Sequence, residues 1–171
     1  MTGKPPFESI VTTHGSTVLR VCRAVVGAAD ADDAWSETFL SAMRAYPDLP
    51  ADANIEAWLV TIAHHKAIDV TRKTARRPIP MATPPDTLTV VEHDRLDDNK
   101  ELVGALQHLP PKQRQAVAYH YLGGLPYAEV AALIGGNAGA ARRAAADAIA
   151  SLRRTYAGAS SQKVETGEHR N

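Results

Sequence analysis

Residues 30–77 decide the fold, and they read DADDAWSETFLSAMRAYPDLPADANIEAWLVTIAHHKAIDVTRKTARR. Apolar residues recur at helical spacing on both sides of a proline-marked loop. This pattern predicts two amphipathic helices, over residues 30–46 and 55–77. The first helix begins acidic and the second ends basic. Such a pair can hold one partner through its acidic half and nucleic acid through its basic half.

The acidic helix carries two kinds of candidate position. Asp30, Asp32 and Asp33 occupy its first turn, where the helix dipole favours negative charge. Asp33 and Glu37 lie one turn apart on a single face. Dipole compensation and solubility account for Asp30, whereas Asp33 and Glu37 continue past the helix start and are candidates for a partner contact. The expected apolar stripe consists of Trp35, Phe39, Leu40 and Met43.

The end of the second helix is strongly basic. Basic side chains near a helix C-terminus commonly only offset the dipole. Five such residues against one acid, Asp69, exceed that need, so contact with phosphates is favoured. The five are Lys66, Arg72, Lys73, Arg76 and Arg77.

Composition narrows the possible classes of protein. Of the 171 residues, 44% are hydrophobic and 22% are charged, which is typical of a soluble globular chain. A formal net charge of zero excludes a globally basic nucleic-acid binder, so any nucleic-acid contact must rest on local charge. Cys22 is the only cysteine, which excludes an intrachain disulfide or a cysteine zinc site.

The sequence also indicates where the chain works. No signal-peptide core and no apolar run of membrane-spanning length is visible, so we expect a cytoplasmic protein with no membrane insertion. The seven histidines are scattered and predict no metal site, and no cofactor is expected. His64 and His65 are adjacent and therefore point to different sides of their helix.

The predicted fold class is all-α, with two small helical domains joined by a proline-rich linker. A helix over residues 7–27, interrupted near His14 and Gly15, belongs with the two helices above in a first domain spanning residues 7–77. Residues 78–98 read as a linker with an acidic end. Residues 157–171 are rich in Gly, Ser and charge, and we expect disorder there.

The second domain, residues 99–156, reads as a helix-turn-helix domain. Proline and glycine pairs at 110–111, 123–124 and 135–136 divide it into short helices, and a last helix runs over residues 138–156. Tyr121 and Tyr156 are expected to face the core. Asn137 is a candidate N-cap of the last helix.

Three segments together resemble one known family: DADDAWSETFL (30–40), AWLVTIAHHKAIDVTRK (57–73) and LPPKQRQAVAYHYLGGLPYAEVAALIG (109–135). They are similar to the extracytoplasmic-function (group IV) sigma factors of bacterial RNA polymerase, in the same order and over about residues 7–154. The resemblance implies sigma region 2 over residues 7–77 and sigma region 4 over residues 99–156. It also implies an alternative sigma factor, not an enzyme, that binds core RNA polymerase and promoter DNA and has an anti-sigma factor as a candidate partner.

The resemblance further implies roles for individual residues. The polymerase-docking segment would contain Asp33, Ser36, Glu37, Phe39 and Leu40. Residues 47–54 would form the loop that captures a flipped base of the minus-ten element, and residues 138–154 the recognition helix for the minus-thirty-five element. The implied DNA-binding residues are Trp58, His65, Lys66, Arg72, Lys73, Arg76, Arg77, Arg142 and Arg143.

The chain departs from the family pattern at several of these positions. The family usually has Gln where Ser36 stands, often Asn where His65 stands, and often an aliphatic residue where Lys66 stands. In the alanine-rich recognition helix only Arg142 and Arg143 are basic in the first half. This composition predicts weak or shape-based contact there, mostly to phosphates.

Two alternatives stay open. An ordinary helix-turn-helix regulator would bind duplex DNA without polymerase, and the 30–77 block argues against it. A degenerate sigma-like protein would bind polymerase but initiate poorly, and the sparse recognition helix is its main support. No residues support an enzymatic function, because the sequence shows neither a phosphate-binding glycine loop nor a nucleophile in a recognisable setting.

Overall fold

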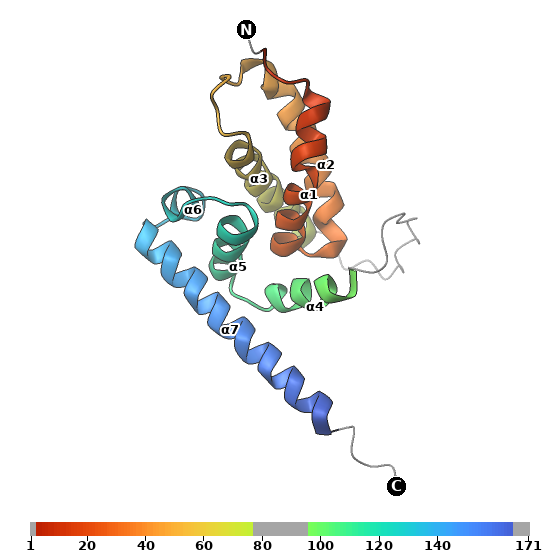
Figure 1. Cartoon of the computed structure of the whole chain (residues 1–171), viewed down its shortest axis with the longest axis vertical. Helices are drawn as coiled ribbons and strands as arrows, with labels where there is room; N and C mark the ends of the chain where they lie inside the picture. The colour runs from red at the N-terminus through yellow and green to blue at the C-terminus, as the bar shows by residue number, and fades with distance from the viewer. Residues whose placement is uncertain (1–2, 77–95, 166–171) are drawn as a thin grey trace.

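The computed structural model describes residues 3–76 and 96–165, and these ranges are all-α. Most of these residues are helical, and neither range contains a β-strand. The predicted fold class of two helical units, the second containing a helix-turn-helix, is confirmed. Figure 1 shows the units as α1–α3 in red to yellow and α4–α7 in green to blue.

The first unit is a bundle of α1 (Phe7–Val26), α2 (Ala28–Ala45) and α3 (Ile55–Arg76). Gly27, at φ 86°, ends α1 and lets α2 fold back at once, a conformation that favours glycine. Pro47 lies in the short 3₁₀ helix η1 (Tyr46–Asp48) that ends α2. The Asn54 side chain accepts a hydrogen bond from the Ala57 N–H at 3.1 Å and so caps α3.

The expected interruption of the first helix is wrong, because α1 is continuous through Gly15. Gly15 is buried where Trp35 of α2 crosses α1. The Trp35 indole N–H donates to the Gly15 carbonyl at 2.9 Å. A Cβ at Gly15 would lie 3.5 Å from the Trp35 ring. The glycine therefore allows close helix packing and does not break the helix.

The second unit contains α4 (Leu96–Gln107), α5 (Pro111–Val117), the π-helical segment η2 (Ala118–Leu122), α6 (Tyr127–Ile134) and α7 (Ala138–Glu165). The predicted cap of α7 is confirmed, because Asn137 Oδ1 accepts from the Ala140 N–H at 2.8 Å. Helix α7 runs to Glu165, so the expected disorder is wrong over residues 157–165. Adding residues to a formed helix costs far less free energy than starting one.

Some predicted inward positions are also wrong. Tyr121 is 58% exposed, whereas Tyr119 is fully buried. The wider π turn of η2 shifts the side chains relative to an α-helix. Tyr119 therefore takes the buried position that was expected for Tyr121. Tyr156 of α7 and Leu40 and Met43 of α2 are exposed as well.

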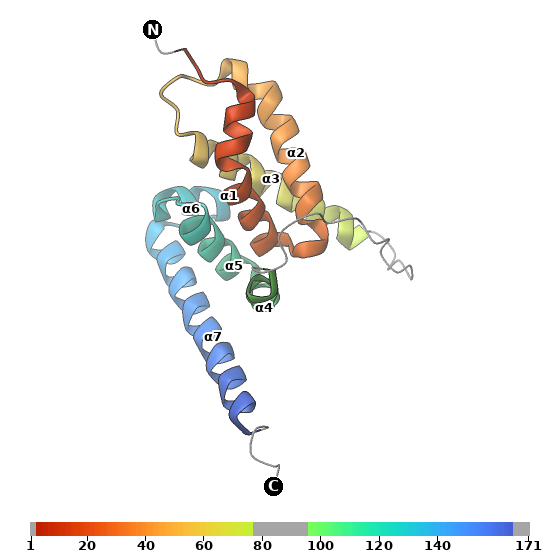
Figure 2. The ribbon, with the colours of Figure 1, turned by 45° about the vertical axis from the view of Figure 1, so that its right-hand side comes forward.

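The two units pack against each other, which the sequence did not predict. Figures 1 and 2 show α4, α5 and α6 beside α1 and α3. One buried cluster includes Val21 and Val60 of the first unit with Leu106, Tyr119 and Leu125 of the second. The predicted linker lies almost entirely outside the described residues, since α4 begins at Leu96.

Candidate functional site

One face of α2 combines acidic and apolar side chains on the surface. Asp33, Ser36 and Glu37 are exposed, and Leu40 and Met43 follow them at helical spacing, 44% and 51% exposed. We call these five residues the α2 stripe. Exposed apolar side chains flanked by charges are typical of a protein-docking surface.

Phe39 differs from the other four predicted docking residues because its side chain is buried. Its ring lies 4.7 Å from that of Trp35 and 6.4 Å from that of Phe7, measured between centroids. Phe39 therefore packs α2 against α1 and fixes the direction in which the α2 stripe faces.

Helix α3 presents three different faces. Leu59 and Ala63 pack into the first unit, and Val60 with Ala67 packs against the second unit. His65, Asp69, Arg72 and Arg76 share the exposed face. Trp58 is half-buried, with its ring 6.4 Å from that of Tyr46, which fits a packing role better than free base stacking.

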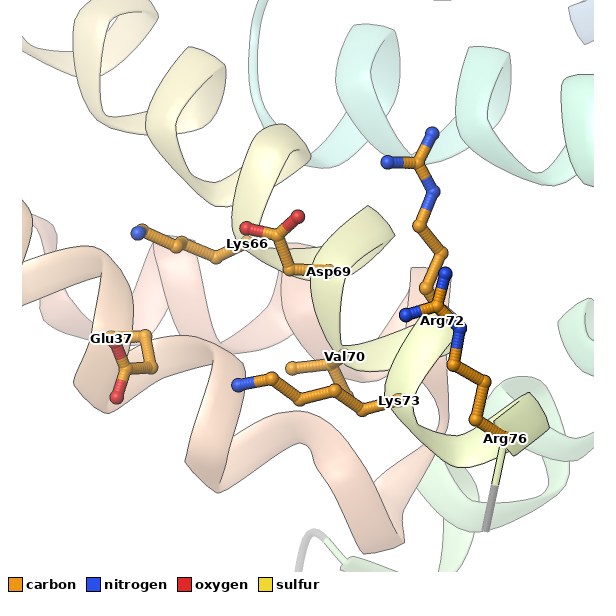
Figure 3. A pocket seen from close by; sticks show the side chains of 7 residues that line it. All are labelled: Glu37, Lys66, Asp69, Val70, Arg72, Lys73 and Arg76. Carbon is orange, nitrogen blue, oxygen red and sulfur yellow. The ribbon is translucent and has the colours of Figure 1, made fainter.

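The basic end of α3 and Glu37 of α2 line a cavity of about 310 Å³, the α2–α3 cleft. Figure 3 shows Lys66 and Lys73 reaching toward α2, where Glu37 lies, while Arg72 and Arg76 extend along the other side of α3. The half-buried Lys66 lines the cleft, since a long side chain can bury its stem and keep its ammonium group at the surface. Arg77, the last predicted basic residue, lies outside the described residues.

The α2–α3 cleft is lined by side chains of opposite charge. Four cationic side chains of α3 can contact phosphates, and the acidic α2 stripe adjoins them through Glu37. A partner protein and nucleic acid could therefore be held at neighbouring surfaces. The described residues contain no cluster of three or more His, Cys, Asp or Glu suited to a metal ion.

Arg142 and Arg143 are exposed near the start of α7, whose opposite side is buried through small residues such as Ala141 and Ala145. The Arg142 guanidinium lies 5.3 Å from the centroid of the Tyr127 ring. That ring stacks on His120 with centroids 3.8 Å apart. The sequence did not indicate this cluster, which fixes the orientation of Arg142.

Comparisons with known proteins match both units. Residues 10–77 match the family model of sigma-70 region 2, and residues 99–152 match that of sigma-70 region 4. The chain is 31% identical over 139 residues to the ECF RNA polymerase sigma factor SigC of Mycobacterium tuberculosis (80% of this chain, 75% of the relative). It is 33% identical over 141 residues to the RNA polymerase sigma factor CarQ of Myxococcus xanthus (80% of each). The chain belongs to the extracytoplasmic-function (ECF) sigma factors.

Solved structures show that the fold is shared. The Bartonella quintana sigma factor RpoE, in complex with the anti-sigma factor NepR, matches with a TM-score of 0.65 at 20% identity, over 86% of this chain and 94% of that one. CnrH, in complex with the cytosolic domain of CnrY, matches with a TM-score of 0.64 at 23% identity, over 89% and 88%. The predicted family is confirmed, and with it the assignment to transcription initiation with RNA polymerase.

A buried polar pair in this sigma factor was not predicted. His64 of α3 is 4% exposed, and its Nδ1 lies 2.6 Å from the hydroxyl oxygen of Tyr119. Burial lowers the pKa of His64, as does neighbouring His65, while a hydrogen bond with the Leu133 backbone acts in the opposite direction. Burial raises the pKa of Tyr119. The only signal in the sequence was the placement of His64 on the face of Val60 and Ala67.

The described helices also bear on membrane association. None of them is long and apolar enough to cross a bilayer within residues 3–76 and 96–165.

Proposed function

We propose that this ECF sigma factor docks on core RNA polymerase through the α2 stripe and contacts promoter DNA through the basic end of α3 and the start of α7. Region 2 would span residues 7–77 and region 4 residues 99–156, joined by a linker over residues 78–98. We further propose that it acts in the cytoplasm and leaves catalysis to the polymerase.

The observation that carries this proposal is the α2–α3 cleft. Glu37 on one wall belongs to the exposed α2 stripe, while Lys66, Arg72, Lys73 and Arg76 come from the other helix. A protein that must join polymerase to DNA needs both kinds of surface within a short distance. We assign direct base contact to His65, because it is exposed on the same side of α3 as Arg72. We also assign it to the loop of residues 47–54, as the resemblance implies.

Region 4 would contribute mainly backbone contacts. Arg142 is held over the Tyr127 ring and Arg143 is exposed, and both suit phosphate oxygens. Few other side chains in this part of α7 can read base edges. This sparse helix favours one second candidate, a sigma-like protein that binds polymerase and initiates poorly. The region 2 match argues against a regulator that acts on duplex DNA alone.

An anti-sigma factor is a proposed partner. The structures of similar fold named above are complexes of a sigma factor with an anti-sigma factor, and of CnrH with CnrY. Exposed Leu40 and Met43 would suit such a protein partner as well as polymerase.

The docking assignment is tested by reversing charge on the α2 stripe. Asp33→Lys with Glu37→Lys should weaken binding to purified core RNA polymerase by at least about tenfold, since each acid is exposed on the proposed contact face. Asp52→Lys with Glu101→Lys makes the same change in net charge at exposed positions elsewhere and should bind normally. Circular dichroism should show unchanged helix content in both. Full affinity of the first variant would remove the assignment.

A further inference from the structure

The contact between the two units is a closely fitted interface. Val60 of α3 meets Gly123, where an added Cβ would lie 3.1 Å from the valine. Gln107 of α4 donates from its side chain to the Ala24 carbonyl of α1 at 3.0 Å. Tyr119 and Val60 are fully buried in the same cluster. Contacts this close indicate that the two units dock in one specific arrangement.

The polar pair in this interface joins one side chain from each unit. The His64 and Tyr119 rings meet edge to face, with centroids 5.2 Å apart. The Tyr119 hydroxyl oxygen lies 2.6 Å from Nδ1 of His64, and a hydrogen bond with the Leu133 backbone is a further influence on the pKa of His64. The buried imidazole of α3 is thus bonded to a side chain of the second unit. A buried polar pair of this kind favours one docked arrangement, because any other leaves a polar atom unsatisfied.

We propose that His64 and Tyr119 form a latch that holds this sigma factor in a closed state, in which it cannot engage both promoter elements. The latch itself follows from the interface alone. Its consequence for promoter binding rests on the proposed function of α3 and α7.

The closed state brings the two proposed DNA surfaces too close together. Residues 57–61 of α3 and 129–133 of α6 line one groove, and α6 packs in turn on α7. Packed helices lie about 8–10 Å apart, so two such steps place the start of α7 about 20 Å from α3. Promoter elements centred near minus ten and minus thirty-five are about 25 base pairs apart, or about 85 Å at about 3.4 Å per base pair.

The chain is long enough to open. Residues 77–95 connect the end of α3 to the start of α4, and a stretch of that length reaches at most on the order of 65 Å. That reach, added to the lengths of the helices, allows the two units to occupy both elements once the interface separates. Opening exposes Val60, Ala67 and Leu106, so a partner that binds one unit alone must displace the other from these residues.

The latch is tested by a distance measurement across the interface. Thr13→Cys on α1 and Ala150→Cys on α7 are exposed and can carry spin labels. Native Cys22 can stay in place, because it is buried and burial raises the pKa of its thiol to about 12. The unsubstituted chain, which should take up no label, is the control. Pulsed dipolar spectroscopy of the free chain should give one narrow distance, and a broad, long distribution would overturn the closed state.

The two tyrosines of η2 provide a matched comparison. Tyr119→Phe keeps the ring but removes the hydroxyl that bonds His64, whereas Tyr121→Phe removes an exposed hydroxyl outside the buried interface. The open fraction is followed through a urea series below the unfolding transition, which circular dichroism defines. Tyr119→Phe should raise the open-to-closed ratio about tenfold, in line with one unsatisfied buried group. Tyr121→Phe should not change it, and equal curves for Tyr119→Phe and the parent would overturn the latch.

Two further measurements complete the test. Gln107→Ala removes the bond to Ala24 at the other end of the interface and should also favour opening, which provides a second variant if Tyr119→Phe folds poorly. Adding purified core RNA polymerase to the labelled chain should lengthen the distance by at least about 30 Å. Polymerase binding at the closed distance would contradict the inference. No binding at all would contradict the proposed function and leave the free-chain result standing.

Discussion

His64 is a buried histidine that is kept neutral by its surroundings. Its Nδ1 lies 2.6 Å from the hydroxyl oxygen of Tyr119, and no side chain of opposite charge stands among the groups that act on its pKa. Burial is the largest influence, followed by His65, and both lower the pKa. Burial is the main cause of the raised pKa of Tyr119; Cys22 of α1 raises that pKa further, and Arg114 of α5 lowers it. The raised pKa values of Cys22 and Tyr119 keep both groups protonated near neutral pH, which leaves His64 as the titrating member of the pair.

This environment predicts a loss of stability in mild acid. Above pH 6.5, the ordinary pKa of histidine, His64 is neutral in folded and unfolded chains alike. As the pH falls below that value, the unfolded chain binds a proton that the folded chain resists. The free energy of unfolding then decreases, by up to about 1.4 kcal/mol per pH unit, until the pH reaches the lowered folded pKa. Urea unfolding between pH 7.5 and 5.0 measures this slope.

The control for this measurement is His64→Asn. Asparagine offers Tyr119 an acceptor but has no proton to gain, so its unfolding free energy should fall less steeply over the same range. The remaining histidines are common to both chains. Equal slopes would show that His64 does not carry the pH dependence.

At the residue scale, sequence reasoning succeeded where a side chain stands on a regular face. The spacing of Asp33 and Glu37 placed both on the surface of α2, and the structure has them there. It failed where local geometry changes the register. Tyr119 and Tyr121 look equivalent in the sequence, and the π turn of η2 decides which one is buried.

At the element scale, α3 is one helix whose faces have separate tasks. The face with Leu59 is buried in the first unit, that with Val60 meets the second unit, and that with Arg72 is open. The basic end extends beyond the core, so its side chains can be changed with little loss of stability. This separation allows DNA contact to be tested without disturbing polymerase docking.

Removing charge from the end of α3 should impair promoter opening selectively. Arg72→Ala with Lys73→Ala should reduce open-complex formation, measured by permanganate reactivity of unpaired thymines, by about tenfold or more. Each lost phosphate contact is expected to contribute on the order of 1 kcal/mol at physiological salt. Affinity for core polymerase should stay within about twofold. Lys100→Ala with Lys112→Ala is a control with the same charge change at exposed positions. Parallel loss of both activities would argue against a DNA role for this helix end.

The start of α7 should show phosphate contact as a change in salt dependence. Arg142→Ala with Arg143→Ala should lower the magnitude of the slope of log K against log salt by about 1.8, or about 0.9 per phosphate. The loss should be similar on promoters of different upstream sequence, because the contacts are to the backbone. Filter binding of the holoenzyme at several salt concentrations measures both quantities. An unchanged slope would show that region 4 does not reach DNA phosphates through these residues.

Elements were predictable where periodicity and helix breakers agree. The proline and glycine pairs marked most helix ends of the second unit, and Asn137 marked the start of α7. The length of α7 was not predictable, because a Gly- and Ser-rich end gives no packing signal and helix propagation needs none. The sequence around Gly15 was misinterpreted for the opposite reason, since the packing of Trp35 overrides a weak helix former.

At the scale of the whole molecule, the two units of this sigma factor form one closed body. Nothing in the sequence separates the inward face of Val60 and Ala67 from the rest of an apolar helix stripe, so the docking between the units was not predictable. The resemblance did predict the order of regions 2 and 4, and the family matches confirm both. On the inference above, such a factor is closed when it is free and open when it binds polymerase and promoter DNA.

The central claim is that this protein directs promoter-specific initiation, and in vitro transcription tests it most directly. Purified core RNA polymerase is given a library of genomic fragments with and without the protein, and the transcripts are sequenced. The account predicts protein-dependent transcripts whose start sites share a two-block upstream sequence, and their loss with Asp33→Lys and Glu37→Lys. Polymerase binding without such transcripts would contradict the claim and indicate the degenerate sigma-like protein instead.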